Sequence, residues 1–282
     1  KLIMKQKFIL FILLMMVSAT GFSQLSDLHY LPPLKQGSNN SSVKEQAIYL
    51  STPETTAFTV NAFIGTATTP DATFSISNIA PGVYTLANGD NDVTMVKNGN
   101  TGIVINSSGL RFESPGGEKF YVNYRGTSSA QATSLTSKGR QALGTKFKWG
   151  GAPNYATTSE ISTSLGIMAT EDNTVVDITG YDFGCEFRLQ NDRDGITSDN
   201  IQITLNKNES FVLEAYTNET SANIDGWLGA SIAATKNIAI SNGGLNYGVV
   251  SSSSGSRDAG IDQPVPENKL GKEYVFIRGN GR

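Results

Sequence analysis

The chain repeats itself, and this internal similarity constrains its fold more than any other feature of the sequence. Three segments recur in the same order, as the pairs 50–60 with 168–178, 93–99 with 203–209, and 118–123 with 235–240. One such match arises easily by chance, but several in one order do not. The repeat is far longer than a solenoid turn or a propeller blade, so it predicts modules that each have a core.

A shorter match sets the boundaries of the expected units. Residues 143–147 resemble residues 270–274, which places the start of a new unit at both positions. We therefore expect a first β-sandwich unit over 24–142, a second over 143–269, and the opening strand of a truncated third over 270–282. Because a third unit would stop after one strand, we expect the sequence to be a piece of a longer protein.

Short alternating segments rich in β-branched residues predict an all-β fold of tandem antiparallel β-sandwiches. In the second unit the expected strands are 146–149, 164–169, 174–178, 186–189, 201–205, 210–215, 230–233 and 238–241. Polar residues typical of turns separate them, at 171–173, 206–209 and 235–237. No segment of the mature chain has a helical period.

Residues 1–23 have the three parts of a secretory signal peptide. Lys5 and Lys7 form a basic start, residues 8–17 are an unbroken apolar run, and Gly21 and Ser23 suit a cleavage site. A run of ten residues is far short of the ~20 that span a bilayer. We expect cleavage after Ser23, export of the mature chain, and no membrane insertion after cleavage.

Composition excludes several classes of function. The net charge is −3 and the leader carries only positive charge, so the mature chain is acidic and has no electrostatic reason to bind nucleic acid. Cys185 and His29 are the only cysteine and histidine. Most histidine-dependent hydrolases and metalloenzymes are thereby excluded, and no acid pair stands out. We predict no catalytic residues, and we expect Cys185 to be a small buried residue.

The first candidate site is a group of acids. Asp192, Asp194 and Asp199 place three carboxylates within eight residues, and calcium prefers oxygen ligands. We predict weak calcium binding there and no other cofactor; the alternative is a solvated turn. A second oxygen-rich segment, residues 88–92, we interpret as a solvated turn.

The second candidate site lies in the long polar connection 243–269. Arg257, Asp258, Asp262 and Gln263 are its candidate binding residues, because long connections without regular structure often carry function. The alternative is an internal Arg–Asp pair that pins the loop.

Three aromatic residues, Trp149, Tyr155 and Trp227, could form a platform for sugars. Side chains of this kind more often fill the core of a sandwich, which is the interpretation that we favour.

Several motifs together resemble a known family. They are residues 260–266 (GIDQPVP), 270–275 (LGKEYV), 168–174 (MATEDNT), 137–144 (SKGRQALG) and 28–33 (LHYLPP). They are similar to the IgGFc-binding-protein N-terminal-like domain in its Bacteroidota version, found near the N-termini of large secreted proteins. The resemblance implies an extracellular protein; many such relatives cross the outer membrane by type IX secretion with a gliding-motility-associated sorting domain. No residue matches an Fc-binding motif, so Fc binding is not carried over.

We therefore expect a non-enzymatic, adhesin-like interaction module of a larger bacterial surface or secreted protein. Its partner would be an extracellular protein or a glycan. Two alternatives stay open: a carbohydrate-binding region of a secreted polysaccharide-degrading enzyme, and a structural stalk.

Overall fold

The computed structural model describes residues 24–35, 43–128, 131–155, 161–248, 258–273 and 275. These residues form antiparallel β-sheets joined by loops, so the all-β prediction is confirmed. Their helical segments are short 3-10 turns: η2 (Asn98–Asn100), η3 (Gly139–Ala142), η4 (Ser221–Ile224) and η5 (Glu267–Lys269). The expected signal peptide, residues 1–23, lies outside the described residues.

The first part of the chain forms two four-stranded antiparallel sheets. One has the order β1 (Leu28–Leu31), β9 (Leu110–Glu113), β4 (Phe58–Ile64), β5 (Ala72–Ile76). The other has the order β11 (Gln131–Thr136), β10 (Tyr121–Ser128), β3 (Lys44–Ser51), β6 (Gly82–Thr85). Alternate residues point inward, as Phe58, Val60 and Ala62 do on β4, so each sheet presents an apolar face to a shared first core.

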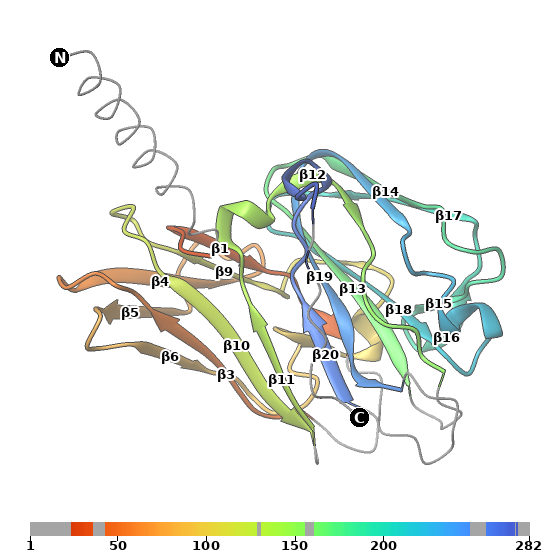
Figure 1. Cartoon of the computed structure of the whole chain (residues 1–282), viewed down its shortest axis with the longest axis horizontal. Coiled ribbons are helices and arrows are strands. Elements are labelled where there is room, and N and C mark those ends of the chain that lie inside the picture. Colours follow the sequence, from red (N-terminus) through yellow and green to blue (C-terminus); the bar gives the residue numbers. More distant parts are fainter. Residues whose placement is uncertain are drawn as a thin grey trace, which may run out of the picture.

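The second part is built on one large sheet, whose members are all antiparallel (Figure 1). Its order is β17 (Asn200–Leu205), β14 (Thr174–Thr179), β19 (Ser231–Tyr247), β13 (Ser162–Ala169), β18 (Ser210–Tyr216), β8 (Val104–Ile105). Two further strands pair with β19, namely β12 (Gly144–Lys148) and β20 (Asp258–Asp262). A hairpin of β15 (Phe187–Leu189) and β16 (Asp192–Ile196) and a parallel pair of β2 (Leu34–Lys35) and β7 (Met95–Val96) complete the strands.

Strand β19 corrects one sequence prediction. The turn expected at 235–237 is absent, and the strand runs without interruption from Ser231 to Tyr247. Its first half pairs with β12 and β14, and its second half with β13 and β20. Strands that pass from one layer of a sandwich to another make such corners. The polar residues 235–237 therefore mark a change of partners and not a reversal of the chain.

The second core lies between the layers of this sheet and the β15–β16 hairpin. Trp149 and Trp227 are fully buried with ring centroids 5.5 Å apart, and Trp149 stacks on Phe187 at 5.8 Å. The interpretation of both tryptophans as core residues is confirmed. Cys185 is buried in the same core, and burial raises the pKa of its thiol to about 11.

The two parts are joined at several places. Strand β8 from the first part pairs with β18 of the second. The segment before β2 packs so closely on β13 that a Cβ at Gly166 would collide with the carbonyl oxygen of Pro33. In the other direction, Leu245, Ala259 and Ile261 of the second part pack into the first core. In Figure 1 strands β11 and β20 run side by side at the junction.

Strand pairing does not confirm the internal repeat. It agrees at one point, because β3 pairs with β10 as β13 pairs with β19. It differs at another, because β3 and β4 belong to separate sheets whereas β13 and β14 share one. Tandem units over 24–142 and 143–269 therefore remain a prediction.

Candidate functional site: a cleft beside strand β20

The predicted binding residues lie on and around β20, where the two parts meet. Asp258 begins the strand and is exposed, and its carboxylate accepts a hydrogen bond from the N–H of Ala259 at 2.8 Å. Asp262 ends the strand and pairs with Lys138 at 2.7 Å. Arg257 lies outside the described residues. An internal ion pair does hold this segment, but its cation is Lys138.

Gln263 has a structural role that differs from the predicted surface contact. Its side chain is fully buried. The amide oxygen accepts hydrogen bonds from the Ser137 hydroxyl (3.0 Å) and the Lys138 N–H (2.7 Å), and the amide nitrogen donates to the carbonyl of Tyr30 (2.6 Å). Gln263 therefore ties the end of β20 to β1 and to the segment after β11, and it does not reach the surface.

An open cleft of about 510 Å³ runs beside β20. Its described lining comes from the end of β12 and the segment after it, from β19, and from β20 and the residues after it: Lys148, Gly150, Gly151, Ala152, Asn242, Gly260, Ile261, Asp262 and Pro264. Small residues dominate, so main-chain groups form much of the wall. Strands β19 and β20 also approach closely here, because Gly243, with φ of 134°, has no Cβ to collide with the Gly260 carbonyl.

Asn242 is the polar residue built into this cleft. Its side chain is only 4% exposed. The amide nitrogen donates to the carbonyl of Gly150, which fixes the orientation of the side chain. The amide oxygen is buried and has no hydrogen-bond partner within the described part of the chain. An acceptor left unpaired in this way costs free energy, and it lies below the surface of the cleft, where a ligand does not reach it.

The two charged residues of the lining have opposite signs. Lys148 is exposed and forms no ion pair with any described residue. The side chain of Asp262 is 67% exposed but already faces Lys138. The unused charge of the cleft is therefore positive.

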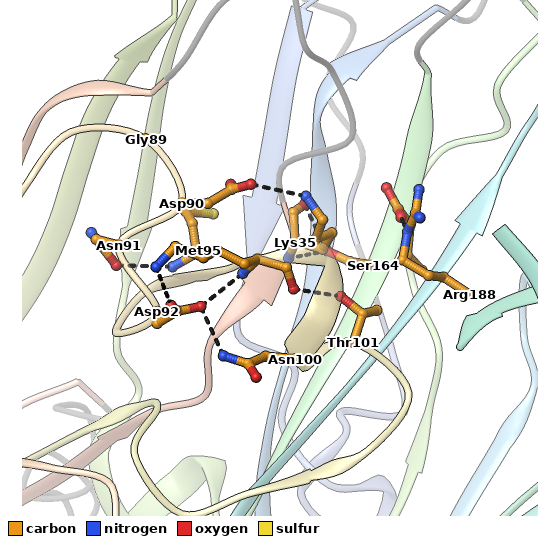
Figure 2. A network of polar contacts seen from close by, with 12 residues as sticks. Lys35, Gly89, Asp90, Asn91, Asp92, Met95, Asn100, Thr101, Ser164 and Arg188 are labelled. Atoms are coloured by element: carbon orange, nitrogen blue, oxygen red, sulfur yellow. Dashed lines mark hydrogen bonds and ion pairs between the residues drawn. The ribbon is translucent and has the colours of Figure 1, made fainter. Parts of the chain in front are cut away.

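A second polar cluster lies deeper, where the first part packs on the second (Figure 2). Lys35 is almost fully buried, and its side-chain ammonium pairs with Asp90 at 3.2 Å. The main-chain N–H of Lys35 donates to the Ser164 hydroxyl on β13. Arg188 and Glu214 form a second buried ion pair. Burial raises the pKa of Asp90, nearby Glu214 adds to this effect, and Lys35 opposes it.

Side-chain oxygens of the turn at 88–92 already accept hydrogen bonds from other residues of the chain. The Asn91 side-chain oxygen accepts from the N–H groups of Val93 and Thr94, at 2.8 and 2.9 Å. The Asp92 carboxylate accepts from the Lys97 N–H at 2.9 Å and the Asn100 amide at 3.0 Å. These contacts, visible in part in Figure 2, leave the turn folded on itself.

The predicted calcium ligands are only partly brought together. Asp192 and Asp194 lie two residues apart on β16, and a hydrogen bond with Asp194 raises the pKa of Asp192. Asp199 follows in the connection to β17. No group of three or more His, Cys, Asp or Glu side chains that could hold a metal ion occurs among the described residues. Weak calcium binding here stays a prediction.

The histidine is a structural residue. His29 is fully buried, its Nε2 faces the carbonyls of Phe120 (2.9 Å) and Ser26 (3.2 Å), and its Nδ1 lies 3.0 Å from the Ser137 hydroxyl. Burial lowers the pKa of His29 to about 4, so the ring is neutral at pH 7. Through Ser137 it belongs to the same hydrogen-bonded group as Gln263.

Comparison with known sequences places the chain in a family. The profile of a family described as IgGFc binding protein matches residues 132–282. The chain belongs to the IgGFc binding protein family. No curated protein and no solved structure matches it. The matched region contains the whole lining of the cleft.

Sequence reasoning missed most of the cleft and all of the buried ion pairs. Asp262 was the one lining residue among the predicted binding residues. The Gly150–Gly151 pair after a strand was the available signal for the rest, but such pairs usually mark turns.

Among the described residues, none belongs to a helix with the length and hydrophobicity that a bilayer span requires.

Proposed function

We propose that this chain is a non-enzymatic, extracellular binding module whose ligand is another protein. The observation that carries the proposal is the position of the cleft, whose lining lies wholly within the region that matches the IgGFc binding protein family. The family is described as IgGFc binding protein, and the Fc that this description names is itself a protein. Fc itself is not proposed as the ligand.

The state of the two most reactive side chains supports a binding role over catalysis. His29 is buried and hydrogen-bonded to main-chain carbonyls, and the Cys185 thiol is buried with a raised pKa. A catalytic base or nucleophile needs access to substrate and a pKa suited to its task. Neither residue has both.

Display outside the cell is part of the same proposal. The leader predicted at residues 1–23 would direct export, and the mature chain would act as an adhesin-like part of a larger surface or secreted protein. A second candidate, binding of glycans through an aromatic platform, loses support because Trp149 and Trp227 are buried.

Array binding tests the proposed function. The fluorescently labelled chain is applied to an array of extracellular proteins and to an array of glycans, with heat-unfolded chain as the control for unspecific capture. We expect saturable binding to protein spots by the folded chain. Binding to glycans alone, or equal binding by the unfolded control, would contradict the proposal.

A further inference from the structure

We propose that the cleft beside β20 binds a carboxylate-bearing segment of the partner protein. In this arrangement Lys148 faces the carboxylate, and the main-chain N–H groups of residues 150–152 donate to its oxygens. In naming this ligand class we rely on the protein-binding function proposed above.

Asn242 positions the wall of the cleft and does not touch the ligand. Its amide nitrogen donates to the carbonyl of Gly150, which holds the glycine segment against β19. Its amide oxygen lies below the surface of the cleft, so a ligand in the cleft does not reach it.

The glycine segment, which Asn242 holds in place, specifies the acceptor group of the ligand. The N–H groups of Gly150, Gly151 and Ala152 donate no hydrogen bond to any other described residue. Main-chain N–H groups free of side-chain cover bind carboxylate and carbonyl oxygens well, as in anion-binding loops. A ligand that presents carboxylate oxygens would satisfy these N–H groups.

The charges of the cleft lining favour a carboxylate over a neutral amide as the ligand group. Lys148 has no ion pair within the described part of the chain, whereas Asp262 is already paired with Lys138. A negative group on the ligand would meet an unopposed ammonium and not a carboxylate. The volume of about 510 Å³ lies within the ~300–1,000 Å³ of small-ligand sites, so it admits a short chain segment and not a folded domain.

Three short peptides test the ligand class. The ¹⁵N-labelled chain is titrated with acetyl-Gly-Gly-Asp-Gly-Gly-amide, with the same peptide carrying Asn in place of Asp, and with acetyl-Gly-Gly-Gly carrying a free terminal carboxylate. We expect the amide resonances of Gly150, Gly151 and Ala152 to shift with the Asp peptide, the terminal carboxylate or both. The Asn peptide should bind about two- to fivefold more weakly. The two carboxylate peptides distinguish a side chain from a chain end as the source.

Two variants and one control test where the peptides bind. Lys148→Gln should weaken binding of the carboxylate peptides about fivefold, while Lys146→Gln, on the same strand but outside the cleft, should leave it unchanged. Ala152→Trp should block binding by filling the cleft. Equal binding of the Asp and Asn peptides, no shift with any peptide, or equal loss in the two lysine variants would overturn the proposal. Should protein spots on the array still bind the Ala152→Trp chain, the protein-binding function stands and its site is elsewhere.

Discussion

The two hydrophobic cores of the molecule are closed in different ways. Every buried member of the second core lies between Phe147 and Ile240, so a continuous stretch of chain supplies it. The first core draws on residues 31–135 and also on Leu245, with Ala259 and Ile261 packed against it. The second part of the chain thus completes its own core and then completes the core of the first.

This difference explains why the cleft is a well-defined surface. Strand β20 pairs with β19 of the second part, while its apolar residues lie against the first core. Lys138, Gln263 and the Tyr30 carbonyl fix its end to the first part. Because β20 is hydrogen-bonded to the second part and packed on the first core, the wall of the cleft that it forms is anchored on two sides.

The largest expected effect comes from removing an aromatic from the self-contained core. Trp227→Ala deletes a fully buried ring in contact with Trp149. It should lower the free energy of unfolding by about 4 kcal/mol, the usual cost of a large aromatic-to-alanine change. Urea unfolding followed by circular dichroism measures this. A loss under about 1 kcal/mol would mean that the ring is not packed as described.

Acid should destabilise the first part of the chain through His29, whose hydrogen-bond partners Ser26, Phe120 and Ser137 all lie there. Its pKa is about 4 in the folded chain and about 6.5 when exposed, so folding favours the neutral ring. The stability from this preference is present above pH 6.5 and is lost as the pH falls toward 4. The loss should reach roughly 3 kcal/mol, at ~1.4 kcal/mol for each unit of pKa difference.

The His29→Gln variant isolates this contribution. Carboxylates such as Asp27, whose pKa is lowered by its hydrogen bond with Arg140, contribute at lower pH in both proteins. Chemical unfolding at pH 7 and pH 4.5 should therefore show a smaller loss in the variant than in wild type. Equal losses of stability in the two proteins would show that His29 does not contribute to the pH dependence.

How far the sequence predicts this molecule depends on the range of the contacts involved. Alternation along a strand is local, so the all-β class and the burial of Trp149 and Trp227 could be predicted. The tie formed by Gln263 joins residues 233 positions apart, and no local pattern reports it. The burial of charged residues such as Lys35 and Arg188 could not be predicted, because nothing local shows the partner that allows it.

The smallest expected effect sharpens the comparison between the two oxygen-rich turns. The turn at 88–92 uses its oxygens internally, whereas Asp192 and Asp194 face each other on an exposed strand. Calcium near 10 mM should raise the melting temperature by about 2 °C if it relieves the repulsion between the two carboxylates. Extracellular calcium sites bind in the ~10⁻⁴–10⁻³ M range. The shift should vanish in the double variant Asp192→Asn/Asp194→Asn. An unchanged melting temperature in wild type would show that the calcium prediction is wrong.

Hydrogen exchange on a pair of matched leucine variants tests most directly whether the second part completes the first core. Leu245→Ala and Leu213→Ala each remove a buried leucine from a strand of the large sheet, but only Leu245 reaches the first core. Under conditions where exchange occurs by local opening, we expect Leu245→Ala to speed exchange in β3 and β10, and Leu213→Ala to speed it in β13 and β18. Faster exchange in β13 and β18 alone after Leu245→Ala would contradict the account.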